Sequence, residues 1–333
     1  MDKTKIAVIG LGGVAQLVHL PILAKLGNVE ISAVAEINKN RLKTIGDKFG
    51  IAKQYTDYRE LLANENVEAV IIATPTNTHL EIASECLKAK KDLLIEKPIA
   101  RNLAEAKEIN SIAKKAKKKV MVGMNLRYRP DAMLMKSLVN SGELGDIFYI
   151  RCGWLRKESS EQKWIFNKSV SGGGVIIDLG ILVLDLALWI MNDMKIKSVS
   201  VQKYSQSTKD VEDSAVGFVR LDNGQVINFE VSWVLHSEAD SFNLTAYGTK
   251  GTAHLNPLRA YRRLDSTQLD YTLANVTNTS NFFKKSYENQ LKHFIGAVRD
   301  TNAVISSADD AVLLMKLLET MYKSAQSKKE INF

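Results

Sequence analysis

The first 125 residues alternate between short apolar runs and longer amphipathic segments. The apolar runs are predicted strands, and they lie at Lys5–Ile9, Glu30–Ala35, Val67–Ala73, Leu93–Ile95 and Val120–Met124, with a further short element ending near Tyr55. The segments between them have helical periodicity, and they are a stretch ending at Leu26, Lys39–Phe49, Tyr58–Ala63, a stretch ending at Ala89, and Leu103–Lys117. Strands that alternate with helices of this length predict a parallel, doubly wound α/β sheet.

The pattern changes after residue 125. A helix is predicted at Asp131–Asn140, a strand at Ile147–Trp154, and a helix at Val175–Leu186 that is apolar nearly all round and therefore buried. Successive strands follow without helices between them, at Ile196–Lys203, Ser214–Leu221, Val226–Val234, Ser241–Tyr247 and Thr252–Asn256. This succession predicts an α/β domain with a large, mostly antiparallel sheet. We therefore expect two domains, residues 1–125 and residues 126–333.

The second sheet is expected to have two different faces. One face would cover the helices of its own domain, and the other has to be solvated or covered by a partner. Phe229, Val231 and Trp233 alternate on one side of their strand, and Asp222-Asn223-Gly224 marks a hairpin turn before it.

Length and composition are those of a globular protein. The chain has 333 residues, of which 45% are hydrophobic and 25% are charged, which suits two folded domains. No apolar run reaches the ~18 residues of a membrane span, and the N-terminus enters a strand without a signal-peptide pattern. Cys86 and Cys152 give neither a disulfide framework nor a zinc spacing. We expect a cytoplasmic protein with no membrane partner and no metal.

The formal charge of +8 raises the question of a nucleic-acid partner. The densest basic run is Lys114–Lys119, at the end of a helical pattern and just before a predicted strand. Lysines in that place complement the helix dipole and face water. No nucleic-acid partner is therefore predicted, although a basic surface also attracts anionic substrates.

The first strand runs into a glycine-rich turn, Gly10-Leu11-Gly12-Gly13-Val14-Ala15. This is the G-x-G-x-x-A form of the dinucleotide fingerprint. Gly10 permits the tight turn, Gly12 lets the backbone approach a pyrophosphate, and Ala15 keeps the helix close to the strand. Strand, turn, helix and second strand together predict a Rossmann domain that binds a dinucleotide.

Glu36 ends the second strand, 21 residues after Ala15. An acid at about this spacing accepts hydrogen bonds from the ribose hydroxyls and repels a 2′-phosphate. Lys39 and Arg41 follow closely and soften that repulsion. NAD(H) is the predicted cofactor, with NADP(H) as the alternative.

The fourth predicted strand ends in Thr74-Pro75-Thr76-Asn77-Thr78-His79, where a helix begins. Hydroxyl and amide groups in this loop suit contacts with a ribose or nicotinamide. The alternative is that Thr78 caps the helix and His79 packs on it.

Glu96-Lys97-Pro98 follows the next apolar run. Proline fixes its own φ and pushes the preceding residue out of the helical region. The Lys97 amine is therefore held on a rigid segment at the carboxyl end of a strand, where doubly wound folds bind ligands.

Two acids interrupt the apolar helix that follows Gly172-Gly173-Gly174. Asp178 and Asp185 are seven residues apart and lie on one face, with Leu182 between them. A buried acid needs a partner. Asp185 is expected to have a structural one, and Asp178 is the better candidate to meet Lys97 or a substrate hydroxyl.

At these motifs the chain resembles the Gfo/Idh/MocA family of NAD(P)-dependent sugar oxidoreductases. The matching residues are Gly10–Ala15, Thr74–His79, Glu96–Pro98, Asn125–Pro130, and near the C-terminus Tyr287–Ala297 and Asp309–Ala325. The resemblance implies a Rossmann domain followed by an α/β domain with a mostly antiparallel sheet, through which the family often oligomerises. A homodimer or homotetramer is expected.

The motifs and the resemblance together predict the site residues. The cofactor set is Gly10, Gly12, Gly13, Val14, Ala15, Glu36, Arg41, Thr74, Pro75, Asn77, His79, Glu96, Lys97 and Asn125. The substrate set is Lys97, Arg127, Tyr128, Trp164, Asp178 and Leu182, with Lys97 and Asp178 as the catalytic residues. The family pattern has an acid/base histidine at position 182, where this chain has leucine.

Two functions follow from this sequence. The first is an oxidoreductase that moves a hydride between NAD(H) and a carbon of a sugar, sugar nucleotide or cyclitol, with Lys97 as acid/base. The second is a sensor or regulator that binds NAD without catalysis, as the galactose-regulon repressor of the family implies, and Leu182 is the residue in its favour.

Overall fold

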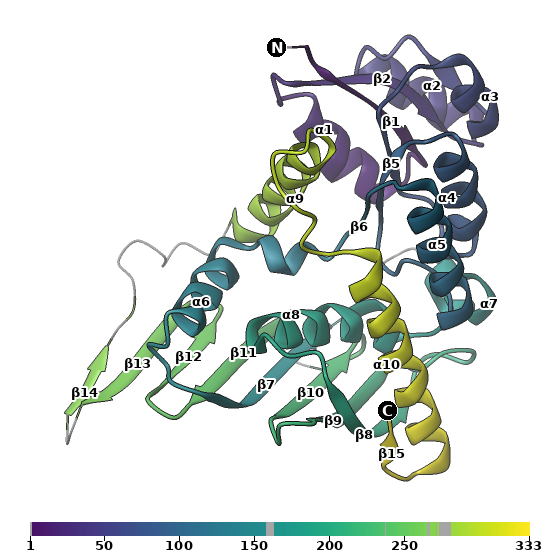
Figure 1. The fold of residues 1–333 in the computed structure, drawn as a ribbon. Coiled ribbons are helices and arrows are strands. Elements are labelled where there is room, and N and C mark those ends of the chain that lie inside the picture. The colour runs from purple at the N-terminus through teal and green to yellow at the C-terminus, as the bar shows by residue number, and fades with distance from the viewer. Residues whose placement is uncertain (1, 158–162, 237, 265–266, 271, 273–280) are drawn as a thin grey trace. The chain divides into compact units, whose positions relative to one another are not determined.

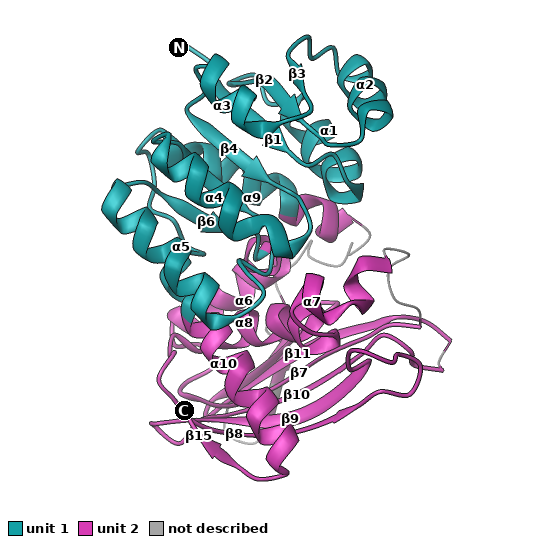
Figure 2. Cartoon of the chain, turned by 90° about the vertical axis from the view of Figure 1, so that its right-hand side faces the viewer, with its two compact units in different colours: residues 1–124, 287–312 teal, residues 125–286, 313–333 magenta. Residues whose placement is uncertain are grey.

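The structure is a computed structural model, and it describes residues 2–157, 163–236, 238–264, 267–270, 272 and 281–333. The chain divides into two compact units, residues 1–124 with 287–312 and residues 125–286 with 313–333 (Figure 2). The boundary after residue 124 lies next to the one expected after residue 125. Residues 287–312 depart from the expected division, because they were expected in the second domain and belong to unit 1. Arg299 shows how they are held, since its guanidinium donates to Thr4 Oγ1 at 2.6 Å and to Asn28 O at 3.1 Å.

Unit 1 contains a six-stranded parallel sheet in the order β3-β2-β1-β4-β5-β6 (Figure 1). Its strands are β1 (Thr4–Ile9), β2 (Val29–Ala35), β3 (Gln54–Tyr55), β4 (Ala69–Ile72), β5 (Asp92–Ile95) and β6 (Val120–Val122). The direction of progression reverses between β1 and β4, which is where doubly wound sheets bind ligands. The predicted Rossmann sheet is confirmed.

The helices of unit 1 follow the predicted segments. They are the π-turn η1 (Ala15–His19), α1 (Leu20–Leu23), α2 (Lys39–Lys48), α3 (Tyr58–Asn64), the 3₁₀ turn η2 (Thr76–Thr78), α4 (His79–Lys88) and α5 (Leu103–Ala116), joined by most of α9 (Phe282–Val298). Asn38, Asp57 and Asn102 cap α2, α3 and α5, because each side chain accepts a hydrogen bond from a first-turn N–H. Local sequence therefore sets where these helices begin.

Unit 2 contains a nine-stranded sheet in the order β14-β13-β12-β11-β7-β10-β9-β8-β15. Its strands are β7 (Ile147–Leu155), β8 (Ile196–Tyr204), β9 (Ser214–Leu221), β10 (Val226–Ser232), β11 (Ser241–Gly248), β12 (Gly251–Leu255), β13 (Arg259–Leu264), β14 (Thr267–Asp270) and β15 (Ile331–Asn332). Only the pair β7 and β10 is parallel among the described pairings. The predicted mostly antiparallel sheet is confirmed.

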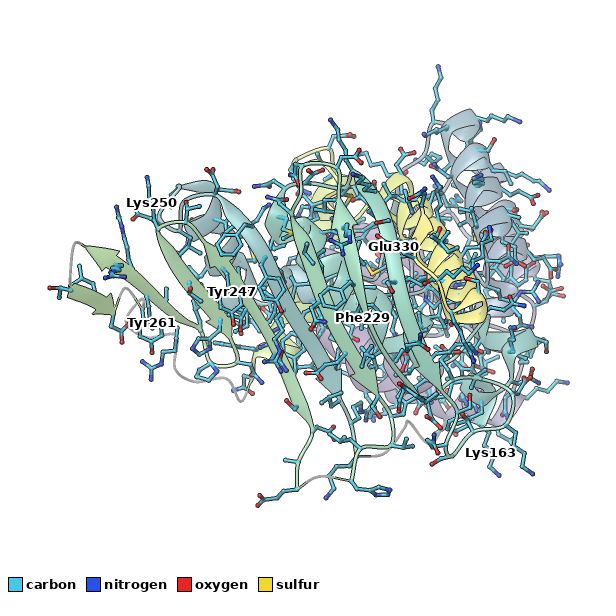
Figure 3. The ribbon with its side chains drawn as sticks, turned by 90° about the horizontal axis from the view of Figure 1, so that it is seen from below. Lys163, Phe229, Tyr247, Lys250, Tyr261 and Glu330 are labelled. Carbon is cyan, nitrogen blue, oxygen red and sulfur yellow. The ribbon has the colours of Figure 1, made fainter. Side chains whose placement is uncertain are left out.

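The helices of unit 2 include its buried core. They are the 3₁₀ turn η3 (Asn125–Tyr128), α6 (Pro130–Asn140), the 3₁₀ turn η4 (Lys163–Phe166), α7 (Lys168–Ser171), the π-turn η5 (Ile176–Gly180), α8 (Ile181–Met191) and most of α10 (Ala308–Ser327). Phe229, Val231 and Trp233 are buried on the face of the sheet that these helices cover. Figure 3 shows the opposite face.

One helical stretch departs from the expectation that no segment could cross a membrane. Among the described residues, Lys168–Met191 is long and apolar enough to do so by length and composition alone. Most of its apolar part is buried inside the protein, however, as in a core helix. The two aspartates of this stretch shorten each apolar run without making the whole stretch polar.

Candidate functional site

The glycine turn after β1 lies at the carboxyl edge of the parallel sheet. Gly10 has φ +89°, and a Cβ there would lie 2.7 Å from the carbonyl oxygen of Ala73. Only glycine fits this position. A Cβ at Gly12 would meet no atom of the chain closer than 3.9 Å, so the fold itself does not require glycine there. The space suits a ligand that approaches the backbone, as the dinucleotide fingerprint predicts.

Glu36 is joined to this turn. Its carboxylate is buried and accepts hydrogen bonds from the backbone N–H groups of Leu11 and Asn38, both at 2.9 Å. Arg41 lies beside it, with Nη1 3.4 Å from Oε2. The structure thus brings together the glycine turn, the acid and the arginine that the sequence predicted for the cofactor.

His79 supports the neighbouring loop. Its ring is buried, with Nδ1 3.0 Å from Pro98 O and Nε2 2.9 Å from Thr74 O. Burial lowers the pKa of His79 and outweighs the opposing effect of these carbonyls, and a neutral ring can donate to only one of them at a time. Both ring nitrogens face carbonyl groups of the protein, so the His79 side chain holds the loop and has no nitrogen left to bind a nucleotide. Thr78 makes no side-chain cap on α4 and donates instead to Thr74 Oγ1 at 2.7 Å.

Lys97 is the partly exposed member of a buried segment. Every other residue from Asp92 to Ala100 is buried. The Lys97–Pro98 peptide is cis. The carboxylate of Glu96 is buried, with Oε1 2.7 Å from His19 Nε2, and its Oε2 accepts from the backbone N–H of Lys97 at 3.3 Å. Glu96 therefore holds the backbone of Lys97, from which the lysine side chain leaves.

In unit 2, Asp178 resembles Lys97 in its exposure. It is the partly exposed member of the otherwise buried segment 173–188. It lies on the π-turn η5, and its Oδ2 accepts a hydrogen bond from Trp233 Nε1 at 3.0 Å. Leu182 is buried, with 4% of its surface exposed.

The glycines before Asp178 are required by a polar pair. Glu212 Oε1 accepts hydrogen bonds from Gly174 N at 3.0 Å, Ile176 N at 3.1 Å and the Tyr322 hydroxyl at 2.8 Å. A Cβ at Gly174 would collide with the backbone of Glu212, and one at Gly173 would collide with Tyr322. Burial, followed by the charge of Glu212, raises the pKa of Tyr322 well above its ordinary value. No local signal pointed to Glu212 or Tyr322, because each is remote in the chain from the turn that it holds.

Two residues predicted to bind substrate lie in the interior. Arg127 donates from Nε and Nη2 to the two oxygens of Asp185 at 2.8 and 2.6 Å, and the two side chains are 2% and 1% exposed. Tyr128 is 2% exposed. The pairing makes a structural role the better interpretation of Arg127, and it supplies the partner expected for Asp185.

Two further predicted site residues differ in burial. Asn125, expected at the cofactor, is buried and donates from Nδ2 to Ser286 Oγ at 3.0 Å. Trp164 is partly exposed on η4. Within the described part of the chain, no group of three or more histidine, cysteine or acidic side chains could hold a metal ion.

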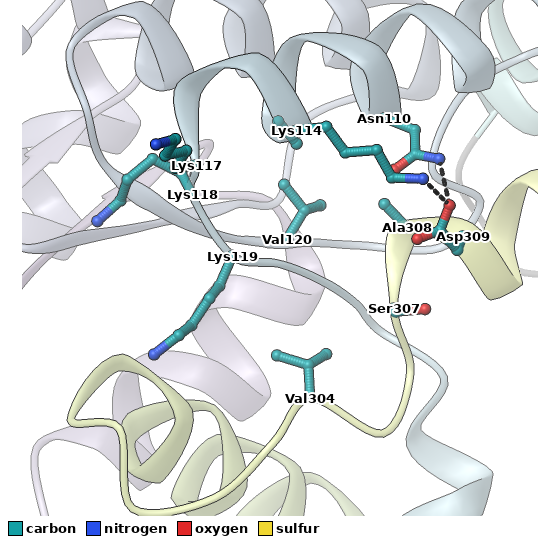
Figure 4. A pocket seen from close by; sticks show the side chains of 11 residues that line it. Asn110, Lys114, Lys117, Lys118, Lys119, Val120, Val304, Ser307, Ala308 and Asp309 are labelled. Carbon is teal, nitrogen blue, oxygen red and sulfur yellow. Dashed lines mark hydrogen bonds and ion pairs between the residues drawn. The ribbon is translucent and has the colours of Figure 1, made fainter.

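The lysine run lines a separate pocket of about 330 Å³ (Figure 4). Val120 starts β6, so the pocket lies at the amino edge of the sheet, opposite the glycine turn. Lys114 lies 2.5 Å from Asp309, Lys118 lies 2.9 Å from Asp92, and Lys119 lies 2.6 Å from Asp300. Most of this basic charge is therefore paired within unit 1.

Comparison with known proteins identifies both parts of the chain. Residues 4–124 match the family model for an oxidoreductase with an NAD-binding Rossmann fold, and residues 136–333 match the C-terminal alpha/beta domain of the same family. D-Glucoside 3-dehydrogenase of Escherichia coli K12 is 25% identical over 97% of this chain and 95% of its own length. Myo-inositol 2-dehydrogenase of Thermotoga maritima is 28% identical over 98% of each chain.

Solved structures share the whole fold. A levoglucosan dehydrogenase in complex with NADH and levoglucosan aligns with a TM-score of 0.90 over 99% of each chain, at 21% identity. An oxidoreductase from Agrobacterium radiobacter, in complex with NAD⁺, L-tartaric acid and magnesium, aligns with a TM-score of 0.89 at 22% identity. With both of its parts matched in order along the chain, this protein belongs to the Gfo/Idh/MocA oxidoreductase family.

Proposed function

We propose that the protein oxidises or reduces a hydroxyl-bearing carbon of a sugar, sugar nucleotide or cyclitol with NAD(H). One observation carries the proposal. Lys97 is the partly exposed residue of a buried segment, and it lies at the edge of the sheet that also holds the glycine turn. The names of the relatives, a glucoside dehydrogenase and an inositol dehydrogenase, support this class of substrate.

The cofactor would be held by unit 1. Backbone N–H groups of Gly12 to Ala15 would face the pyrophosphate, Glu36 would accept from the ribose hydroxyls, and the Thr74–Asn77 loop would face the nicotinamide side. Once bound, the nicotinamide ring supplies the carbon that accepts or returns a hydride. Glu36 favours NAD(H) over NADP(H), while Arg41 leaves NADP(H) as a weaker alternative.

Lys97 would carry the proton. When an alcohol is oxidised, its carbon loses a hydride and its oxygen loses a proton, which the unprotonated amine of Lys97 accepts; reduction returns both. Asp178 would orient the substrate, and Trp164 and Leu182 would line its apolar side. Leu182 cannot carry a proton, so the lysine takes the whole acid/base task in this proposal.

The decisive experiment is a panel of sugars, sugar nucleotides and inositols incubated with the purified protein and NAD⁺, followed at the absorbance of NADH. Reduction with any of them supports an enzyme. Tight NAD(H) binding without turnover on the whole panel favours the alternative, a non-catalytic sensor, for which Leu182 is the supporting residue.

We also propose that the protein is cytoplasmic and forms a homodimer or homotetramer through the open face of the unit 2 sheet. In this proposal residues 126–333 supply both the substrate side and the contact between copies. Val216 and Phe218 on β9 are 44% and 48% exposed. Tyr149 stacks on Tyr247, which Figure 3 labels, with ring centroids 5.2 Å apart. Sedimentation at micromolar concentration should show a dimer or larger, and Phe218→Glu should shift it to monomer. A monomeric unmodified protein would refute this assembly.

A further inference from the structure

His19 is a fully buried histidine of unit 1 that has no role in the proposed function. It ends the π-turn η1 directly after the glycine turn, and its side chain has 0% exposure. The widened turn of a π-helix is rare and occurs frequently at functional sites. The sequence contained no signal for this residue, because its partner lies 77 positions away.

The contact of His19 leads directly to the lysine segment. Nε2 lies 2.7 Å from Glu96 Oε1, and the second oxygen of Glu96 accepts the backbone N–H of Lys97 at 3.3 Å. A Cβ at Gly123, the residue directly after β6, would lie 3.0 Å from that second oxygen. Tyr287 packs against His19 itself in an edge-to-face arrangement, with the ring centroids 6.0 Å apart. The carboxylate of Glu96 therefore lies between His19, the Lys97 peptide and Gly123.

Charge explains why this enclosure needs His19. Burial alone would raise the pKa of Glu96, but the hydrogen bond and charge of His19, followed by the charge of Lys97, hold it below its ordinary value. Without His19, the 3.3 Å bond from the Lys97 N–H would be the principal remaining hydrogen bond of a buried carboxylate. Such a group takes up a proton or moves until it finds a new donor.

The fold alone does not account for a histidine here. Nδ1 of His19 is buried and has no hydrogen-bond partner among the residues that the structure describes. An unsatisfied buried nitrogen opposes folding, so an apolar side chain of similar size would serve packing better. The nitrogen that does bind is the one directed at Glu96.

We propose that His19 is a positioning residue for Lys97. It fixes the carboxylate of Glu96, and Glu96 fixes the peptide from which the lysine side chain leaves. His79 holds the same segment at the next residue, through the carbonyl of Pro98. The effect on catalysis rests on the proposed function of Lys97, whereas the effect on the Lys97 backbone does not.

The first test separates a hydrogen-bond donor from a packing group. His19→Leu removes the donor and His19→Gln keeps one. Misplacing a catalytic group by about 1 Å costs up to ~10²-fold in rate. We therefore expect His19→Leu to lower kcat about 10- to 100-fold, with KM and the Kd for NAD⁺ within about threefold, and His19→Gln to restore most of kcat. The control is His293→Leu, which replaces a half-buried histidine of the same unit and should leave kcat, KM and the Kd for NAD⁺ unchanged. Equal losses in both His19 variants would overturn the proposal.

The second test needs no substrate. In protein labelled with ¹⁵N-lysine, the Lys97 amide resonance is the one lost in Lys97→Arg, and it should shift in His19→Leu and stay in place in His19→Gln. An unshifted resonance in a folded His19→Leu protein would overturn the proposal, even if kcat fell. If the unmodified protein oxidises no substrate, the proposed function fails while this resonance still tests the positioning. Should His19→Leu not fold, Glu96→Gln weakens the same contact and should shift the same resonance.

Discussion

Two π-turns can be compared, one in each unit. Both follow a glycine-rich segment, and each carries a polar side chain that is held by a residue from a distant segment. In unit 1 this side chain is His19, which is fully buried and lies 2.7 Å from Glu96 Oε1. In unit 2 it is Asp178, which remains partly exposed and is held by Trp233. In the roles proposed above, the same local geometry would support a functional group in one unit and present one in the other.

The surroundings of the two turns also differ. In unit 1 the contact between His19 and Glu96 lies directly beside the backbone of Lys97, the proposed proton carrier. Unit 2 secures its turn with Glu212, whose carboxylate accepts hydrogen bonds from the backbone N–H groups of Gly174 and Ile176 at 3.0 and 3.1 Å. Substitutions in the two regions should consequently have different effects, on catalysis in unit 1 and on stability in unit 2.

The largest expected effect is on turnover, at Lys97. General acid–base assistance is worth roughly 10²- to 10⁴-fold, so Lys97→Ala should lose at least 10²-fold in kcat. NAD⁺ binding should survive, because the glycine turn and Glu36 are unchanged. Steady-state kinetics and fluorescence titration measure the two quantities. Lys88→Ala, an exposed lysine paired with Glu85 on α4, is the matched control. Turnover at the original rate in Lys97→Ala would end the catalytic interpretation of this residue.

Breaking the buried ion pair between Arg127 and Asp185 should lower the free energy of unfolding. Arg127→Met leaves the charge of Asp185 buried without its partner, which costs about 3–5 kcal/mol. Adding Asp185→Leu removes that charge, so the double variant should recover most of the loss in denaturant unfolding. If Arg127 instead bound substrate, the single variant would unfold normally and show a raised KM.

The glycine loop of unit 2 should show a smaller loss. Gly174→Ala forces a Cβ into the backbone of Glu212 and should cost about 1–3 kcal/mol, as overpacking does. Gly27→Ala is the control, because a Cβ there meets nothing within 4 Å. Unfolding by urea compares them, and equal stabilities would show that the loop yields without strain.

Much of the fold could be predicted because its signals are local. Strand and helix periods, caps such as Asn38, and turn residues such as Gly10 act within a few residues, and the residues at the ends of parallel strands meet at one edge by topology. The contacts that were missed join distant parts of the chain. Arg127 and Asp185 are 58 positions apart, and His19 and Glu96 are 77. The helix α9 (Phe282–Val298) shows an apolar face in its sequence, but that face does not indicate which unit the helix covers.

The smallest expected effect concerns cofactor choice, and it tests whether Glu36 selects NAD(H) over NADP(H). Glu36 is buried, bound to two backbone N–H groups and 3.4 Å from Arg41, so a 2′-phosphate would meet a fixed negative charge that a half-exposed arginine only partly offsets. NAD(H) should bind several-fold more tightly than NADP(H), and Glu36→Ala should narrow the gap by freeing Arg41 for the phosphate. Arg41→Ala should widen it. Titration by nicotinamide fluorescence gives both affinities, and equal affinities in the unmodified protein would show that Glu36 braces the glycine turn without selecting the cofactor.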